Sequence, residues 1–353
     1  MSQIVDNPAI PLQRLPKVSV VMSVYNGGSY VEEAMNSILG QTFTDFELIL
    51  IDDGSTDRTP AIIASFSDPR IVRINHPTNV GLVTALREGV ERARGELIAR
   101  MDADDISLPE RFAKQVVFFD THPEVGVLGT AMRQVNSAGQ LLAIISPPTD
   151  HALIEWSSLF ESTVMHPTVM MRRSVVLQAG NYNPDYIHVE DTELWSRMIL
   201  ITRFANLSEP LCIRRWRVGS ISYQKSSLQQ QRSAEIRLQL LQKILGRELP
   251  KNLATTYIRA WANPAAALSI DTVSQVILLL SEANQKLIAA NQSAPNFSAI
   301  AQQLQTDLAH RIITLSQRDS RLITKLIYRW FRTHTPYTVK NWINRLLAQR
   351  HSS

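Results

Sequence analysis

The sequence of 353 residues contains a single cysteine, Cys212, so no internal disulfide can form. A chain without disulfides suits a reducing compartment. Residues 1–17 lack the apolar segment of a secretory signal, and no stretch approaches the ~20 apolar residues that a transmembrane helix needs. These absences lead us to expect a soluble or peripheral protein that is cytoplasmic or bound at the inner face of the plasma membrane.

The sequence also lacks a large net charge, since its formal value is +4 at pH 7. From residue 311 onward, however, nine Lys and Arg stand against one acid, Asp319, so the tail is strongly basic. The same tail has an apolar stripe that includes Leu322, Leu326 and Trp330. Such a helix can lie on an anionic membrane or dock onto the rest of the protein or a dimer partner, and both hypotheses stay open. We expect no nucleic-acid partner.

Short apolar strands and amphipathic helices alternate from residue 17 to residue 130. The order β-α-β-α-β-α-β predicts an α/β fold with a doubly wound, mostly parallel sheet flanked by helices. Strands are expected over 18–22, 47–51, 71–74, 96–101 and 125–129 and, further along the chain, over 164–171, with a helix over 192–200.

The pattern divides the chain into four segments. Residues 1–16 contain three prolines and form an irregular lead-in, residues 17–130 form the α/β half, and residues 131–224 are mixed. From residue 225 to residue 353 Gly and Pro become scarce and the helical period dominates. This last segment is predicted to be a C-terminal all-helical appendage.

Acidic side chains follow two of the expected strands at the point where each strand ends. Asp52 and Asp53 follow one strand, and Asp102, Asp104 and Asp105 follow another. The carboxyl ends of parallel strands share one edge of a sheet, where open α/β folds bind ligands. Carboxylates crowded there repel one another unless a cation or hydrogen-bond donors hold them. The pattern predicts a site for a divalent metal and a nucleotide.

Each acidic group also has a simpler interpretation. Asp53 can accept the N–H of a uracil-like base, or it can cap the helix that follows. Asp102 and Asp104 would share one face of an extended segment, where they suit Mn²⁺ or Mg²⁺. They could instead cap the helix that begins near Pro109, but three acids exceed what capping needs, which favours the metal.

The mixed segment offers residues for the opposite side of a cleft. Glu190 and Asp191 precede a helix with an apolar stripe, where an acid either caps the helix or serves as a general base on the acceptor side. His166 either enters the cleft or is a buried structural group.

A basic cluster surrounds Trp216 and consists of Arg214, Arg215 and Arg217. It either grips diphosphate oxygens or forms a solvated face. Cys212 has no evident partner in the sequence and is expected to be a small buried residue.

These motifs, taken in order, resemble the family 2 glycosyltransferases of the GT-A fold. The resemblance covers about residues 17–222, and its fourth and sixth blocks contain that family's DxD and ED motifs. The six blocks are residues 18–26 (VSVVMSVYN), 41–57 (QTFTDFELILIDDGSTD), 79–82 (NVGL), 102–105 (DADD), 166–173 (HPTVMMRR) and 190–195 (EDTELW).

The resemblance implies roles for individual residues on the donor side. Ser23, Tyr25 and Asp53 would contact the nucleoside of a nucleotide-sugar donor. Asp102 would meet the ribose or the metal, and Asp104 would ligate the metal.

On the acceptor side the resemblance makes Asp191 the catalytic base, with Glu190 and His166 beside it. The family often has a histidine that contacts the metal or diphosphate where this chain has Arg217. An arginine stays protonated and does not ligate a metal. Arg217 would instead neutralise the departing diphosphate.

We therefore predict an inverting glycosyltransferase that uses Mn²⁺ or Mg²⁺. It would move a sugar from a nucleoside-diphosphate sugar, a UDP-sugar being favoured, to a hydroxyl of a glycan, lipid-linked or other acceptor in cell-surface polysaccharide synthesis. A nucleotidyltransferase would have a Gly-rich basic loop after the first strand, but residues 25–29 contain no Lys or Arg. A non-catalytic nucleotide-sugar-binding protein would not require both Asp104 and Asp191.

Overall fold

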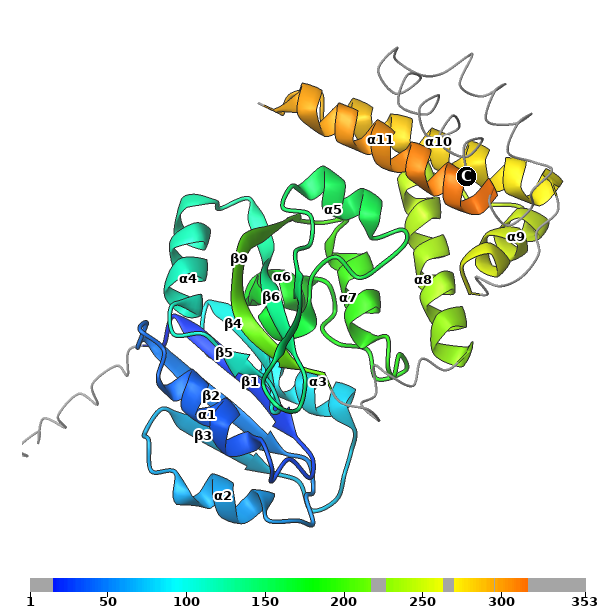
Figure 1. The fold of residues 1–353 in the computed structure, drawn as a ribbon. Coiled ribbons are helices and arrows are strands. Elements are labelled where there is room, and N and C mark those ends of the chain that lie inside the picture. Colours follow the sequence, from blue (N-terminus) through cyan, green and yellow to red (C-terminus); the bar gives the residue numbers. More distant parts are fainter. Residues whose placement is uncertain (1–14, 217–226, 263–269, 295, 317–353) are drawn as a thin grey trace, which may run out of the picture.

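A computed structural model describes residues 15–216, 227–262, 270–294 and 296–316 (Figure 1). Arg217 and residues 317–353, which make up most of the basic tail, lie outside the described residues. The proposed contact of Arg217 with a diphosphate and the two hypotheses for the tail therefore stay predictions.

A nine-stranded sheet forms the centre of the described structure, in the order β3-β2-β1-β4-β8-β6-β9-β5, with β7 paired to β6. Strands β3, β2, β1 and β4 run parallel to one another, while β8 is antiparallel to both β4 and β6. The predicted α/β class with a mostly parallel sheet is confirmed. The strands are β1 (Val18–Val24), β2 (Phe46–Asp52), β3 (Ile71–Asn75), β4 (Leu97–Asp102), β5 (Ile106–Ser107), β6 (Val125–Val135), β7 (Leu141–Ile145), β8 (Met170–Arg172) and β9 (Arg203–Arg215).

Helices cover both faces of this sheet because alternate strand residues point to opposite sides. In β1, Val20 and Met22 pack into one apolar core with α1 and α4, whereas Val21 packs into the other with α3 and α7. All three side chains are at most 1% exposed. The helices of this part are α1 (Val31–Leu39), α2 (Thr59–Ser65), α3 (Leu82–Arg92), α4 (Arg111–Thr121), α5 (His151–Ser157), α6 (Arg173–Gln178) and α7 (Glu190–Met198).

Two local predictions in the mixed segment differ from the structure. The strand expected over 164–171 is instead a 3₁₀ turn at His166–Thr168 followed by the short strand β8. Pro167 has no N–H to donate to a strand ladder, which is why pairing begins only after it. The helix expected over 192–200 begins two residues earlier, so Glu190 and Asp191 lie in its first turn rather than before it.

The described C-terminal segment consists of helices and the short turns between them, and it packs against the α/β part (Figure 1). The indole Nε1 of Trp156 on α5 donates a hydrogen bond to Asp307 at 2.7 Å, and the Tyr257 hydroxyl donates to the carbonyl of Leu159 at 3.1 Å. One apolar core contains side chains from α5, α7 and the four C-terminal helices that the structure describes. These are α8 (Ser227–Leu245), α9 (Lys251–Ala262), α10 (Ile270–Ala290) and α11 (Phe297–Ser316).

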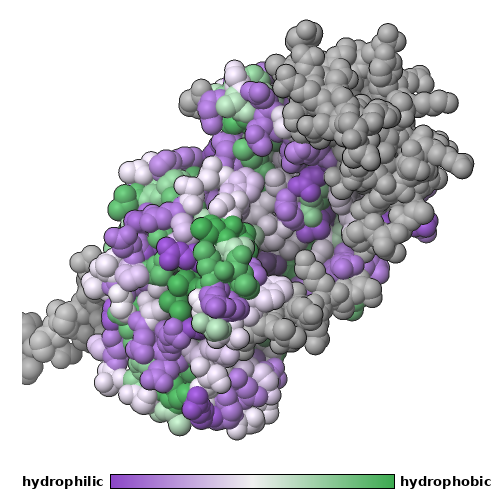
Figure 2. All heavy atoms as spheres, viewed as in Figure 1, coloured by the Kyte–Doolittle hydropathy of each residue, from purple (hydrophilic) through white to green (hydrophobic). Residues whose placement is uncertain are grey.

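No described helix is both long enough and apolar enough to cross a bilayer. On the face shown in Figure 2, apolar residues form separate patches among hydrophilic ones.

Candidate active site

The strand register brings the predicted donor-side residues to one edge of the sheet. Ser23 on β1 is paired with Ile51 of β2 on one side and with Asp102 of β4 on the other. Tyr25 follows β1 and is 52% exposed. The backbone N–H of Asp53 donates to the carbonyl of Val24 at 2.8 Å, which extends the pairing of β1 and β2 to this edge.

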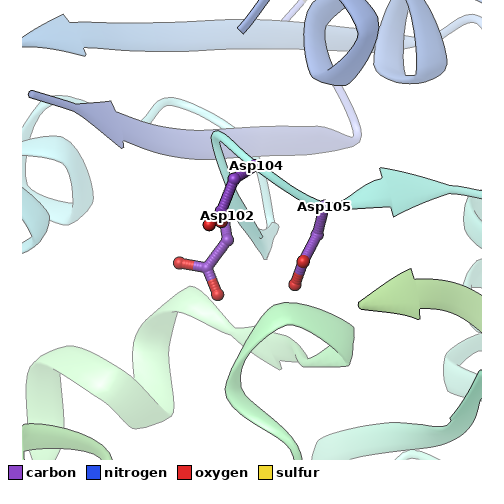
Figure 3. A group of neighbouring side chains, drawn as sticks. All are labelled: Asp102, Asp104 and Asp105. Carbon is purple, nitrogen blue, oxygen red and sulfur yellow. The ribbon is translucent and has the colours of Figure 1, made fainter. Parts of the chain in front are cut away.

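Asp102, Asp104 and Asp105 form a compact acidic cluster at that edge. One carboxylate oxygen from each residue lies within 4.8 Å of those from the other two (Figure 3). The expected extended segment is wrong: β4 ends at Asp102, and a turn follows, which brings the side chains together. Burial and the charges of Asp102 and Asp104 raise the pKa of Asp105 well above its usual range. Three carboxylates in such a cluster fit a hard divalent cation, which offsets their repulsion.

The capping alternative for these acids does not agree with the structure. The helix after the cluster, α4, begins at Arg111, and its N-cap residue is Glu110, which makes no side-chain capping bond. The aspartates therefore do not cap this helix, which leaves the metal interpretation.

Arg215 is hydrogen-bonded to the turn that carries the acidic cluster. Its backbone N–H donates to Asp105 at 3.1 Å, and its guanidinium donates to the carbonyl of Asp104 at 2.9 Å. The same guanidinium pairs with Glu33 on α1. Arg215 thus positions the acidic turn, while Arg214 stacks on Trp216 with 5.8 Å from its guanidinium carbon to the ring centre.

Arg100 links the acidic cluster to the opposite side of the site. It is 3% exposed, and its Nη1 lies 2.5 Å from Oδ2 of Asp102. The charge of Arg100 also acts on Glu190 and Asp191, where it opposes the increase in both pKa values. The two acids of the ED motif and Asp102 therefore lie within electrostatic reach of one buried cation.

Asp191 and Glu190 occupy the first turn of α7, and neither caps it, because the N-cap residue is Val189. Burial raises the pKa of Asp191, although hydrogen bonds from the N–H and hydroxyl of Thr192 oppose this increase. Burial and the charge of Asp191 raise the pKa of Glu190 to about 7. The Oε2 atom of Glu190 is buried without a hydrogen-bond partner among the described residues.

His166 is buried rather than exposed in an open cleft. It is 8% exposed, and its Nε2 lies 2.7 Å from the hydroxyl oxygen of Tyr182. Burial and the charge of Arg100 lower the pKa of His166 well below its usual range, so the ring is neutral near pH 7. This geometry favours the structural interpretation of His166, and its contact with an acceptor stays a prediction.

Asp53 is 2% exposed and holds the loop between β3 and α3. It accepts hydrogen bonds from the backbone N–H groups of Val80 and Gly81, each at 2.9 Å, and lies 2.8 Å from Nδ1 of His76. A carboxylate has about four lone-pair positions, and these three contacts use most of them. The contact of Asp53 with a base stays a prediction.

Sequence reasoning missed three groups of this site: Arg100, Tyr182 and His76. The signal for Arg100 was a charge in the middle of an expected buried strand, since such residues are rarely buried without a partner. No local sequence pattern indicated that Tyr182 or His76 would belong to the site.

Cys212, expected to be buried, is 1% exposed and contacts the carbonyl of Pro167 at 3.6 Å.

Comparisons with known proteins place the chain in a family. A family model described as glycosyl transferase family 2 matches residues 19–177. The chain is 38% identical over 188 residues to the putative glycosyltransferase EpsE of Bacillus subtilis, a match that takes in 52% of this chain and 66% of the relative. It is 32% identical over 222 residues to the O-antigen biosynthesis glycosyltransferase WbnJ of Escherichia coli, covering 62% of this chain and 85% of the relative.

Among solved structures, residues 1–349 of S. aureus TarS in complex with UDP-GlcNAc superpose with a TM-score of 0.55 at 20% identity. The superposition covers 82% of this chain and 89% of the other, and it shows a shared GT-A fold. With the family match and these relatives, the chain belongs to glycosyl transferase family 2 and is a glycosyltransferase.

Proposed function

We propose that this glycosyltransferase inverts the anomeric centre as it moves a sugar from a nucleoside-diphosphate sugar to an acceptor hydroxyl. The observation that supports this most is the arrangement around Arg100, which is paired with Asp102 and acts electrostatically on Asp191. One buried cation thus connects the acidic cluster on the donor side with a candidate base on the acceptor side.

Ser23, Tyr25 and Asp53 would hold the nucleoside at the carboxyl edge of β1 and β2. Asp102, Asp104 and Asp105 would hold Mn²⁺ or Mg²⁺. When bound, that ion supplies positive charge near the diphosphate, the kind of electrostatic stabilisation that usually contributes most to a rate.

Asp191 would accept the proton of the acceptor hydroxyl as the hydroxyl oxygen attacks the anomeric carbon. The new carbon–oxygen bond forms on one face while the bond to the diphosphate breaks on the other, and the electron pair leaves with the diphosphate. General base catalysis of this type contributes about 10²–10⁴-fold to a rate. A single displacement inverts the anomeric configuration without a covalent intermediate on the protein.

The acceptor is proposed to be a growing glycan or a lipid-linked one, in cell-surface polysaccharide synthesis. This proposal is supported by the names of two relatives, one in O-antigen biosynthesis and one in amylovoran biosynthesis. The second relative, AmsE of Erwinia amylovora, is 31% identical over 198 residues and is covered to 74% of its length.

The test is a panel of nucleotide sugars, with UDP-sugars first, supplied with Mn²⁺ and a mixture of glycan acceptors. Thermal stabilisation identifies the donor, because a ligand that binds only the folded state raises the melting temperature. Proton NMR of the product then gives its anomeric configuration. Retention of the donor's configuration would contradict the proposed displacement.

A further inference from the structure

The turn that carries the acidic cluster, residues 103–105, depends on contacts with other parts of the chain. Within the turn, the N–H of Asp105 donates to the carbonyl of Asp102 at 3.4 Å, which is long for such a bond. The three carboxylates of the cluster also repel one another at their short separation, which favours a more open turn. Groups outside the turn therefore decide how closely these side chains converge.

Arg215, the last residue of β9, supplies two of these contacts. Its backbone N–H donates to Oδ1 of Asp105 at 3.1 Å, and its Nη1 donates to the carbonyl oxygen of Asp104 at 2.9 Å. The backbone before it is fixed as well, because Ile213 and Cys212 pair with the two residues of β5, the strand that follows the turn. Arg215 thus binds both aspartates at the end of the turn from the adjacent strand.

The side chain of Arg215 is held in place by the start of α1. Its Nη2 pairs with Oε2 of Glu33, and its guanidinium carbon lies 5.3 Å from the centre of the Tyr30 ring, which directly precedes α1. The side chain is 12% exposed, so most of it is withdrawn from water. A planar guanidinium that is bonded on two sides loses rotamer freedom and holds the carbonyl of Asp104 in one place.

The hydrogen bonds of this guanidinium go to groups other than the carboxylates of the cluster. One Nη group is bonded to a backbone carbonyl and the other to Glu33, which lies on α1. Arg100 differs in this respect, because it pairs directly with the carboxylate of Asp102 at 2.5 Å. The guanidinium of Arg215 therefore acts on the shape of the turn, whereas that of Arg100 acts on its charge.

We propose that Arg215, held by Glu33, is a positioning residue for the divalent cation. It sets how Asp104 and Asp105 converge, and so the affinity for the metal, without contacting the ion. This inference rests on the proposed function, in which the acidic cluster holds Mn²⁺ or Mg²⁺. Groups that support metal ligands in this way typically contribute about 10–100-fold to metal affinity. Arg215 has this role although it is 110 residues from Asp105 in the sequence.

The test titrates Mn²⁺ into the full chain and follows the free ion by electron paramagnetic resonance. Arg215→Gln should weaken Mn²⁺ binding about tenfold, because the carbonyl of Asp104 loses its charged donor. Arg215→Lys should weaken it less, since an ammonium still pairs with Glu33 but lacks the second donor of the planar fork. Glu33→Gln should weaken it about two- to fivefold, the range expected for one exposed ion pair.

The matched control is Glu32→Gln, which removes the exposed carboxylate next to Glu33 in the first turn of α1. Both variants remove an acid that favours the N-terminus of this helix, so they differ in the pair with Arg215. The control should keep the Mn²⁺ affinity of the wild type. The double variant Arg215→Gln/Glu33→Gln should bind Mn²⁺ as Arg215→Gln does, because Glu33 acts through Arg215. Losses that simply add would contradict the part assigned to Glu33.

Two measurements without metal separate positioning from a general loss of structure. These are the melting temperature and the calorimetric binding of UDP, both in the presence of a chelator. A positioning residue changes the Mn²⁺ affinity by a much larger factor than the metal-free UDP affinity. Equal factors for the two in Arg215→Gln would mean a purely structural role and overturn the inference. Should Arg215→Gln not fold, Arg215→Lys and Glu33→Gln provide the same comparison.

The outcome for the proposed function is separate. If the wild type transfers sugar with Mn²⁺ but Arg215→Gln binds the ion as tightly as Glu32→Gln does, the inference fails and the function stands. If Arg215→Gln weakens Mn²⁺ binding as expected but no nucleotide sugar serves as a donor, the function fails and the positioning role remains. A wild type that binds no Mn²⁺, with or without UDP, overturns the inference even if it transfers sugar.

Discussion

The imidazole of His76 bridges two carboxylates, with Nδ1 2.8 Å from Oδ1 of Asp53 and Nε2 2.8 Å from Glu88 on α3. Its hydrogen bond with Asp53 and then that with Glu88 raise the pKa of His76, while burial opposes the increase. The ring therefore ties the acid at the end of β2 to the helix that follows the next strand. It fixes the carboxylate that the proposed function assigns to the nucleoside.

His76→Gln should destabilise the protein by about 1–3 kcal/mol at about pH 6, where the ring is charged and both carboxylates are ionised, because it removes hydrogen bonds to charged groups. When the pKa of a histidine is higher in the folded than in the unfolded protein, its charged form stabilises the folded state. This stabilisation is complete at pH values below the unfolded-state pKa, and it is lost as pH rises through the folded-state pKa. Urea unfolding should show that the difference in free energy of unfolding between wild type and variant decreases from about pH 6 to about pH 9.

His122→Gln is the matched control for this experiment. The ring of His122 contacts the hydroxyl of Thr121 and the carbonyl of Phe118 instead of carboxylates. His122→Gln therefore removes an imidazole without removing a pair with a carboxylate, and its loss of stability is measured at the same pH values. If the loss of stability in His76→Gln stayed constant with pH, the charge of His76 would not be the cause of the stabilisation.

Gly54→Ala should weaken both the fold and the binding of UDP. Gly54 has a φ of +75°, and a Cβ there would lie 2.5–2.6 Å from backbone atoms of Thr78 and Asn79. Gly139 has a similar φ of +77° but nothing within 4 Å of the added Cβ, so Gly139→Ala shows the backbone penalty alone, about 1 kcal/mol. Urea unfolding and UDP titration of both variants test this. If the two variants lost equal amounts of stability and UDP affinity, the close approach of the Cβ at residue 54 to the backbone would not be the cause.

The sequence predicted the parallel half of the sheet well because each of its strands is a local pattern. Buried runs such as those in β1, β2 and β4 end at residues whose side chains reach one edge, so the pattern alone assigns Asp53 and Asp102 to the same edge. The arrangement of β8 between β4 and β6 could not be predicted, since β8 has three residues and its pairing depends on partners far along the chain.

The candidate site was only partly predictable for the same reason. The acids of the cluster and of the ED motif are visible in the sequence, but the cation that connects them, Arg100, is defined by its relation to acids on both β4 and α7. The packing of α8 against α7 is likewise absent from any local pattern, since periodicity predicts that α8 is a helix and gives no partner for it.

Asp104→Asn should have opposite effects on the protein with and without metal. Without metal it relieves repulsion among the three carboxylates, so the melting temperature should rise. A metal at 100 times its dissociation constant stabilises the wild type by about 2.7 kcal/mol, and most of this gain should be lost in the variant. Thermal unfolding with and without Mn²⁺ measures both effects.

The control for the metal experiment is Asp120→Asn, which changes an exposed aspartate paired with Lys17. It should retain the stabilisation by Mn²⁺. Full retention of that stabilisation in Asp104→Asn would exclude Asp104 as a ligand.

Asp191→Asn should abolish sugar transfer and leave donor binding nearly unchanged, because an amide does not accept the hydroxyl proton. The expected loss in kcat is at least about 10²–10⁴-fold. Turnover is measured with the donor found in the panel, and donor binding is measured by calorimetry. Asp185→Asn is the matched control, since Asp185 is exposed in the loop before α7, and its activity should be normal. An active Asp191→Asn would remove the proposed base.

Asp307→Ala should destabilise the α/β part together with the C-terminal helices. Asp307 accepts the indole N–H of Trp156 at 2.7 Å and a bond from Arg311 at 3.2 Å, so its loss leaves a partly buried donor unpaired, at about 1–3 kcal/mol. The two parts share one apolar core, so the variant should still unfold in a single transition. Far-UV circular dichroism and tryptophan fluorescence should both report that transition.

The control is Glu282→Gln, which breaks the exposed pair with Arg247 and should change stability by less than about 1 kcal/mol. Two separate transitions in Asp307→Ala would mean that the C-terminal helices fold as an independent domain.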